Sequence, residues 1–386
     1  MKKLYRLDAW HKLLALRFKS LKWRHGVLIA LLILVTLTKM IPLWGFIYTT
    51  RIYPVIGTLL SPISGIFPFA VGDIFIALSI AWVILYPIYE MGWRKKMVLG
   101  RVAEYLLWVY AWFYIAWGLN YSQPNIYYRI GMKPVEVSKA KFKKFAYQYA
   151  DSLNALSIAS LSNARKSISP DSIVDDALKN RVRDAVLKEY NKIGYREGIN
   201  KPFNQHPHAK TMVFTPLSSM AGVTGSMGPF FCEFTLNGDI LAHDYPATYA
   251  HEFAHFLGVA NEGEANFYSY IVCTASADKQ VRFSGYYHIF FHVLNNVFDI
   301  LGEKEGERFL KHIRPEIIQR AKNDRHYWLS KRCKVLDAAQ DVIFELYLKG
   351  NHVAEGRKSY SGVIGLILAW NEKKETILKY KSKKRF

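Results

Sequence analysis

Three long apolar stretches in the first third of the 386-residue chain constrain its fold most. They run from Val27 to about Ile47, from Ile74 to Met91 and from Val102 to Leu119, and each carries very few charged residues. Each has about the length that a helix needs to cross the hydrocarbon core of a bilayer. A backbone in lipid must satisfy its own hydrogen bonds, which favours helices. We therefore expect three transmembrane helices; the alternative is three buried helices of a soluble protein.

The placement of basic residues predicts the orientation of these helices, because loops rich in Lys and Arg stay in the cytoplasm. Many basic residues precede the first stretch and several lie between the second and third, whereas only Arg51 lies between the first and second. This pattern predicts a basic cytoplasmic N-terminus over 1–26, three transmembrane helices over 27–119 and an extracytoplasmic domain over 120–386. We expect a multi-pass protein of the cytoplasmic membrane.

The overall charge of +21 arises from 52 Lys+Arg against 31 Asp+Glu, and part of it belongs to the segments that flank the apolar stretches. The rest gives the outer domain a mildly basic surface, which suits anionic lipid headgroups. No aromatic-basic RNA motif or zinc-finger spacing accompanies the charge, so we expect no nucleic-acid partner. Three cysteines are too few for a disulfide framework or a paired CxxC site.

The outer domain is predicted to be α+β and mainly helical. Ser138 and Ser172 stand where they could cap two amphipathic helices. The run FFCEFTL at 230–236 alternates apolar and polar residues, as a half-buried strand does. Further helices are predicted over 246–257, 262–277, about 285–301, 303–321, 333–349 and 360–370.

The chemistry-bearing motif is His-Glu-Phe-Ala-His at 251–255. Positions i and i+4 share one face of a helix, so His251 and His255 can present two imidazoles to one Zn²⁺. Glu252 is then placed to hold and deprotonate a metal-bound water. The alternative is a surface helix with a solvated polar edge. The small and apolar neighbours of the motif favour a buried helix, where unpaired polar side chains are costly.

A catalytic zinc site needs a third protein ligand and one open position. Asn261 stands where a longer zincin motif has its last histidine, but it is a poor zinc ligand. Glu262 and Glu264 remain. Asn261 and Glu264 have the spacing of a capping box, which gives Glu264 a structural role. Glu262 is therefore the first choice with Glu264 as the alternative, and Asn266 can orient a ligand histidine from behind.

The pattern Glu-x-x-Ala-Asn after an HExxH resembles the gluzincin metallopeptidases, in which this glutamate is the third ligand. The chain as a whole resembles a family of bacterial multi-pass membrane proteins catalogued as a domain of unknown function. The stretches that carry this resemblance are Pro68–Asp73, Trp117–Tyr121, Gly225–Glu233, His251–His255, Glu262–Phe267, Tyr347–Asn351 and Ser359–Tyr360. The resemblance implies a membrane-anchored, zinc-dependent, zincin-like domain in the bacterial cytoplasmic membrane, and it implies no particular substrate.

The expected function is thus hydrolysis of peptide bonds at the outer face of the membrane, in a protein or a cell-wall peptide. The stretch Gly222–Leu236 is either a strand that pairs with an extended substrate or an ordinary sheet strand. The alternative function is a non-catalytic membrane protein, in which zinc braces the fold or the domain binds a partner. The donor to the developing oxyanion stays open among Tyr286, Tyr287, His288, His292, His326 and Tyr327.

Overall fold

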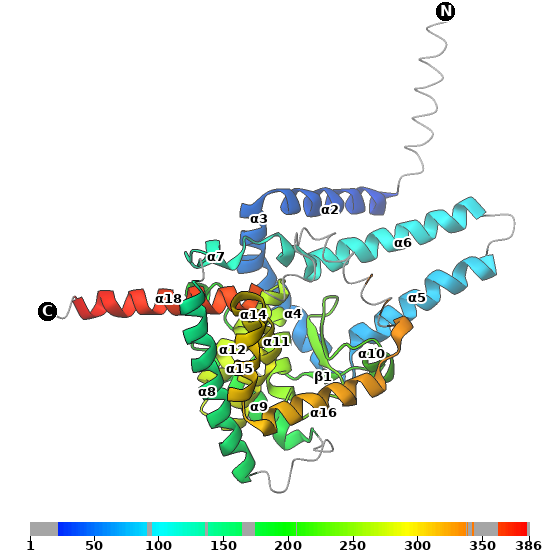
Figure 1. Ribbon diagram of the computed structural model, residues 1–386. Helices are drawn as coiled ribbons and strands as arrows, with labels where there is room; N and C mark the ends of the chain where they lie inside the picture. Colours follow the sequence, from blue (N-terminus) through cyan, green and yellow to red (C-terminus); the bar gives the residue numbers. More distant parts are fainter. Residues whose placement is uncertain are drawn as a thin grey trace, which may run out of the picture.

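A computed structural model shows a mainly helical protein with one small sheet (Figure 1). It describes residues 22–90, 95–135, 138–163, 174–205, 207–336, 338, 342 and 362–383. The N-terminal helices are α2 (Trp23–Met40), α3 (Pro42–Ile47), α4 (Tyr53–Gly65), α5 (Val71–Glu90), α6 (Lys95–Ala116) and α7 (Ile126–Arg129). The later helices are α8 (Lys139–Asn163), α9 (Asp176–Tyr190), α10 (Thr215–Met220), α11 (Tyr245–Phe256), α12 (Glu262–Ala275), α13 (Lys279–His288), α14 (Phe290–Leu301), α15 (Glu303–His312), α16 (Pro315–Lys331) and α18 (Gly362–Lys383).

Two helices of the described residues, not the predicted three, are long and apolar enough to cross a membrane by length and composition. They are α2, with a mean hydropathy of 1.4, and α5, with 2.0. Helix α6 does not reach this level because it begins in the basic segment at Lys95 and includes Arg101 and Glu104. In Figure 1, α5 and α6 extend together away from the body of the protein, and α2 lies along α6, with which it is in contact.

Polar contacts fix α2 and α6 in a parallel arrangement. The guanidinium of Arg24, near the start of α2, lies 2.9 Å from the carboxylate of Glu104 in the first half of α6. Toward the other end, the ammonium of Lys39 donates to the hydroxyl of Tyr114 over 3.0 Å. Arg24, Lys39 and Glu104 therefore each pair with the neighbouring helix.

The sheet has the strand order β1 (Lys210–Thr211), β3 (Glu233–Leu236), β2 (Gly225–Gly228), with β1 parallel and β2 antiparallel to β3. All four residues of β3 are buried, so the prediction of a half-buried strand is wrong. The carboxylate of Glu233 accepts hydrogen bonds from Lys210 at 2.6 Å and from the backbone N–H of Gly72 at 2.5 Å. This polar face is covered because the start of α5 packs on it.

Other element predictions hold in part. Ser138 caps α8 through its hydroxyl, which accepts from Lys141 N at 3.3 Å. Asp175 caps α9, whereas the predicted cap Ser172 lies outside the described residues, as does most of the predicted helix over 333–349. The two helices predicted over 285–301 and 303–321 have different bounds in the structure. The helical conformation is interrupted at Ile289 and again near Ile313, so this region belongs to α13, α14, α15 and α16.

Helix α11 is buried along its whole length, and its last turn is bonded to four other segments. The carbonyl of His255 accepts from Trp117 Nε1 at 3.0 Å, and that of Phe256 accepts from the Tyr53 hydroxyl at 2.7 Å. The next two carbonyls, of residues 257 and 258, accept from Asn200 Nδ2 at 2.9 Å and from Gln123 Nε2 at 2.7 Å. Because the last carbonyls of a helix have no partner within it, these side chains satisfy a buried helix end.

We expect the Tyr53→Phe variant to be destabilised by about 1–3 kcal/mol, because it leaves a buried carbonyl without its donor. The matched control is Tyr195→Phe, since the exposed Tyr195 donates to the carbonyl of Thr50 at 3.1 Å. Thermal unfolding of the full chain in detergent measures both. Equal midpoints for the two variants would contradict the importance of the buried bond.

Candidate metal centre

The helix that carries the HExxH motif is positioned by an aromatic cluster on one face. Asp244 is its N-cap residue and Pro246 lies in its first turn. Phe253 and Phe256 pack with Phe234 of β3 at ring-centroid distances of 5.9 and 5.6 Å. Gly258 ends the helix with a φ of +94°, a conformation that favours glycine. The opposite face of the helix presents the two histidines.

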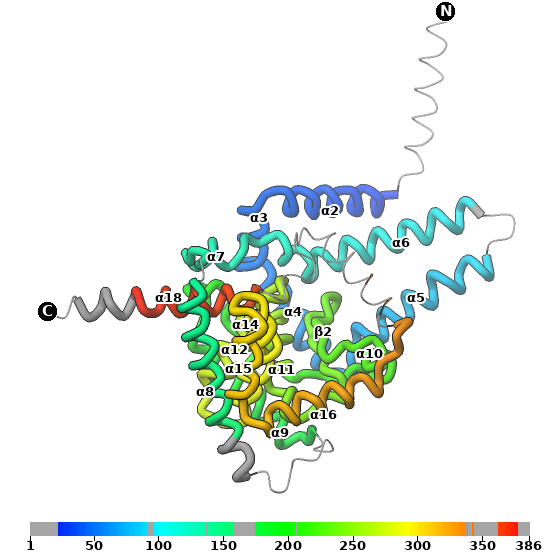
Figure 2. Tube along the Cα trace, viewed as in Figure 1, coloured from blue at the N-terminus to red at the C-terminus, as the bar shows by residue number. Residues whose placement is uncertain are grey.

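Helix α12 returns directly against α11 and begins beside these histidines. Its N-cap residue Asn261 accepts from the backbone N–H of Glu264 at 3.0 Å, so the predicted N-cap is confirmed. The Glu264 side chain does not complete the predicted capping box, because its carboxylate bonds Arg129 and Ile126. Glu262 is the first residue of the helix and Asn266 lies one turn further on the same face. In Figure 2, α11 lies between α12 and β2, and it is in contact with both.

The structure brings His251, His255 and Glu262 together. The two Nε2 atoms are 3.1 Å apart, and Oε2 of Glu262 lies 3.1 Å from His251 Nε2 and 3.5 Å from His255 Nε2. One potential ligand atom from each residue lies within 4.8 Å of the others. The spacing therefore suits a single small ion shared by the three side chains.

The other nitrogen of each imidazole is already bonded. His251 Nδ1 donates to Asn266 Oδ1 at 2.8 Å, and His255 Nδ1 donates to the carbonyl of Val259 at 2.6 Å. When the proton is on Nδ1, each Nε2 carries a lone pair. These lone pairs point toward the Nε2 atom of the other histidine and toward the carboxylate of Glu262. Three electron-rich atoms at this distance require a proton or a metal cation among them. Two imidazole nitrogens and one carboxylate oxygen are a donor set that fits Zn²⁺.

The protonation of the cluster follows from the same contacts. Burial alone would raise the pKa of Glu262, but His255 and His251 outweigh it and lower this pKa well below its usual value. Burial lowers the pKa of His255, and the neighbouring Glu262 more than offsets this, giving a pKa of about 9. The carboxylate of Glu262 is therefore ionised although it is buried, as metal ligation requires.

Glu252 lies beside the cluster with one oxygen unused. It is buried, and its Oε2 makes no hydrogen bond within the described part of the chain. Strand β2 runs along its other side so closely that a Cβ at Gly225 would lie 2.4 Å from Glu252 Oε1. Burial raises the pKa of Glu252, against a lowering by the two histidines. A buried carboxyl of raised pKa suits proton transfer near neutral pH.

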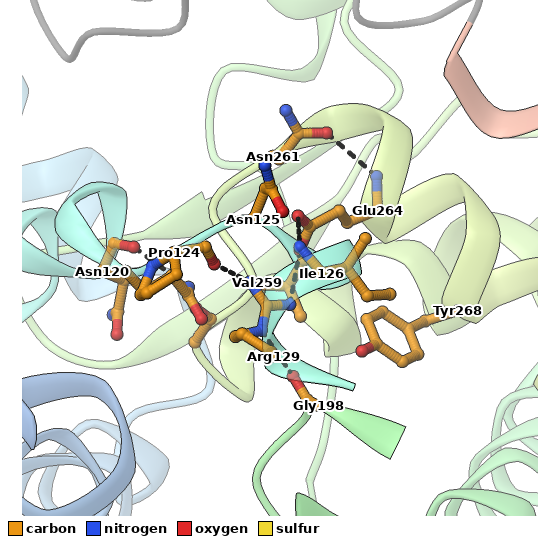
Figure 3. Close-up of polar contacts among 12 residues, drawn as sticks. Asn120, Pro124, Asn125, Ile126, Arg129, Gly198, Val259, Asn261, Glu264 and Tyr268 are labelled. Carbon is orange, nitrogen blue, oxygen red and sulfur yellow. Dashed lines mark hydrogen bonds and ion pairs between the residues drawn. The ribbon is translucent and has the colours of Figure 1, made fainter. Parts of the chain in front are cut away.

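Glu264 does not face the histidines. Its carboxylate accepts from the guanidinium of Arg129 at 2.5 Å and from the backbone N–H of Ile126 at 2.9 Å (Figure 3). Arg129 also donates to the carbonyls of Gly198 and Pro124. The two alternatives for the third ligand are thus separated, since Glu262 lies in the cluster and Glu264 joins α12 to α7.

His288 lies behind the cluster, where sequence reasoning did not place it. Its Nε2 donates to the same oxygen of Asn266 that His251 bonds, at 2.9 Å. Burial, together with His251 and His292, lowers the pKa of His288 to about 3, so this imidazole is neutral. The i, i+4 spacing of His288 and His292 does not predict that His288 bonds Asn266. Two other oxyanion candidates donate to groups outside the cluster. The hydroxyl of Tyr287 donates to Asp324, and the hydroxyl of Tyr327 donates to the carbonyl of Asp239.

A second group, His243, Asp244 and Asp324, also brings its ligand atoms within 4.8 Å of one another. His243 Nε2 lies 2.9 Å from Asp324 Oδ2, which the hydroxyl of Tyr287 also reaches. These side chains are only half-buried, and they join α16 to the start of α11. No motif in the sequence indicated this contact.

The family model described as "Protein of unknown function (DUF3810)" matches residues 48–368, so the chain belongs to this family. The match begins before α4 and includes the whole cluster of His251, His255 and Glu262. No curated protein and no solved structure matches the chain. The resemblance to a family of unknown function is therefore confirmed, whereas the likeness to gluzincins stays a prediction.

We expect Arg129→Met to cost about 3–5 kcal/mol of stability, because it leaves the buried Glu264 carboxylate without its cation. The side chains of Arg129 and Glu264 are only 3% and 7% exposed. The matched control is Lys141→Met, which breaks an exposed pair with Glu372 at 2.6 Å and is expected to cost about 1 kcal/mol or less.

Thermal unfolding of the full chain in detergent measures this difference. The double variant Arg129→Met with Glu264→Gln should recover part of the loss, since no buried charge is then left unpaired. Equal losses for Arg129→Met and Lys141→Met would contradict the structural role of Glu264.

Proposed function

We propose that this family member is a membrane-anchored zinc metallopeptidase that hydrolyses peptide bonds at the outer face of the cytoplasmic membrane. The observation that carries the proposal is the pair of imidazoles whose Nδ1 atoms are bonded to Asn266 and Val259, leaving both Nε2 atoms facing Glu262. A buried free carboxyl oxygen on Glu252 lies beside this donor set. A structural helix pair has no need of this combination.

His251, His255 and Glu262 would hold the ion. A Zn²⁺ ion bound there supplies Lewis acidity toward the scissile carbonyl and toward water. Glu252 accepts a proton from the attacking water and returns it to the leaving amine. The hydrogen bonds from Nδ1 orient both imidazoles with Nε2 toward the ion, and the shared oxygen of Asn266 fixes His251 against His288.

Strand β2 supports the assignment of a peptide as substrate. Among the described strands it lies at the edge of the sheet, with β3 on its inner side. The close approach of Gly225 to Glu252 places this edge beside the proposed proton acceptor. An extended peptide can add to a free strand edge through main-chain hydrogen bonds. The region Gly222–Leu236 is thus proposed to position the substrate, whether it comes from a protein or a cell-wall peptide.

The rival function, a zinc that only braces the fold, requires a closed set of four protein ligands. Glu264 and His288 are two residues near the cluster that could complete such a set. Glu264 is held by Arg129, and His288 donates to Asn266. These contacts favour three protein ligands and leave the fourth position without a protein ligand among the described residues.

For the membrane topology, we propose that α6 crosses the bilayer with the two apolar helices α2 and α5. Arg101 and Glu104 lie in its first part, where Glu104 is neutralised by Arg24. The parallel contact between α2 and α6 agrees with a cytoplasmic N-terminus for both helices. The domain after α6 then lies outside, as the basic residues of the N-terminal segment predict.

We expect the full-length protein, purified in detergent, to contain about one equivalent of zinc, as one three-ligand site predicts. His251→Ala and Glu262→Ala should lose most of it. Two controls should keep it: His312→Ala, an exposed histidine paired with Asp151, and Glu264→Gln, the alternative ligand. The full chain is needed because Tyr53 and Trp117 bond the end of α11. Zinc loss in Glu264→Gln with retention in Glu262→Ala would overturn the ligand assignment.

We expect Glu252→Gln to bind zinc normally and to lose activity by at least about 100-fold, because general-base catalysis contributes about 10²–10⁴. The measurement is cleavage of a mixed peptide library by the full chain in detergent, read by mass spectrometry. His312→Ala should keep wild-type activity. A zinc-loaded wild-type protein that cleaves nothing would favour the non-catalytic alternative, and full activity in Glu252→Gln would remove Glu252 from the mechanism.

A further inference from the structure

Helix α4 has one face in the protein and a second, apolar face that the described residues do not cover. Its buried residues are Tyr53, Gly57, Ser61 and Ser64, which recur every three or four positions. The opposite stripe is formed by exposed apolar side chains, of which Leu59 is 64% exposed and Ile66, just after the helix, 77%. The stripe consists of Ile52, Val55, Leu59, Ile63 and Ile66. The sequence analysis did not predict a helix between the first two apolar stretches.

Helix α9 serves as a comparison, because its exposed face carries the charged side chains that are typical of a helix in contact with water. It also buries one face, through Leu178, Val182 and Val186, but its exposed positions include Arg181, Asp184 and Lys188. The two helices thus share one-sided burial and differ in the chemistry of the exposed side. A stripe of this size on a helix in water would be an aggregation hazard or a binding surface.

No charged residue occurs anywhere between Arg51 and Asp73 in the sequence. The hydroxyl of Thr58, on the exposed side of the helix, donates to the carbonyl of Pro54 at 2.7 Å. The hydroxyl of Ser61 faces the protein and accepts from Asn204 at 2.8 Å. The outward surface of α4 therefore consists of apolar side chains and of polar groups that are hydrogen-bonded within the helix, as contact with lipid requires.

We propose that the exposed face of α4 lies among the acyl chains of the outer leaflet, so that α4 is a helix embedded in one leaflet rather than part of a water-exposed loop. At about 1.5 Å per residue it is too short to cross a bilayer. Only Ile66–Ala70 separate it from α5, and the exposed Phe67 and Phe69 continue its apolar surface toward that helix. This continuity with an apolar helix long enough to span makes lipid the occupant, in preference to a second copy of the chain.

The embedded helix would set the height of the metal centre above the membrane. Tyr53, in the first turn of α4, donates to the carbonyl of Phe256, the residue that follows the ligand His255. Trp117, directly after α6, donates to the carbonyl of His255 itself. The cluster is therefore tied to the lipid surface by two short connections, independently of whether it hydrolyses anything.

The test is site-directed spin labelling of the full chain in vesicles of phosphatidylcholine and phosphatidylglycerol. Cys232 and Cys273 are buried, and Cys333 is replaced by serine to leave one reactive site. One label is attached at Leu59→Cys and a second, in a separate protein, at Ile63→Cys. The control label is at Lys188→Cys, on the exposed face of α9. Relaxation by oxygen, which enters lipid, is compared with relaxation by a water-soluble nickel chelate.

We expect the labels on α4 to respond strongly to oxygen and hardly to nickel, with the reverse at Lys188→Cys. These positions are exposed, so labelling should leave the fold intact, and an unchanged thermal-unfolding midpoint checks this. Nickel accessibility on α4 equal to that at Lys188→Cys would overturn the proposal in favour of a water-exposed surface. Protection from both reagents would also overturn it, because protein, such as a second copy of the chain, would then cover the face.

Discussion

The buried end of helix α11 has the strongest influence on how the other segments pack. A helix leaves its last carbonyls without partners, and in a buried position this costs free energy unless other groups supply donors. Here the carbonyls of His255, Phe256 and the two residues that follow accept from Trp117, Tyr53, Asn200 and Gln123. The donors come from segments that are distant in sequence, so satisfying one helix end brings α4, the segment after α6 and the segment after α9 together around α11.

This packing continues on the strand side of α11. Phe230, in the turn between β2 and β3, contacts Phe75 of α5 at a centroid distance of 4.9 Å, and its carbonyl accepts from Trp112 of α6 at 3.0 Å. The sheet edge next to Glu252 is thus braced by the same two helices that extend from the body in Figure 1. The cluster and its neighbouring strand are both fixed relative to α5 and α6.

Three glutamates near the cluster have different environments although they are close in sequence. Glu262 is ionised between two imidazoles, and Glu264 is neutralised by Arg129. Glu252, buried and with one oxygen unbonded, has a raised pKa. Their chemistry is set by what surrounds each carboxylate and not by the residue type, since burial opposes charge and a nearby cation restores it. The proposed division into ligand, structural ion pair and proton acceptor follows from these surroundings.

The features that depend on local spacing could be predicted from the sequence alone. The i, i+4 pair His251 and His255, the cap at Asn261, the positive φ of Gly258 and the apolar helices α2 and α5 all follow from neighbours a few positions away. The tertiary fold selects the carboxylate that faces the histidines, because the partner of Glu264 is Arg129, far away in the chain. It also decided that β3 is buried on both faces and that α4 exposes an apolar stripe. Local patterns fix which face a side chain takes, whereas its partner depends on how distant segments pack, which spacing does not encode.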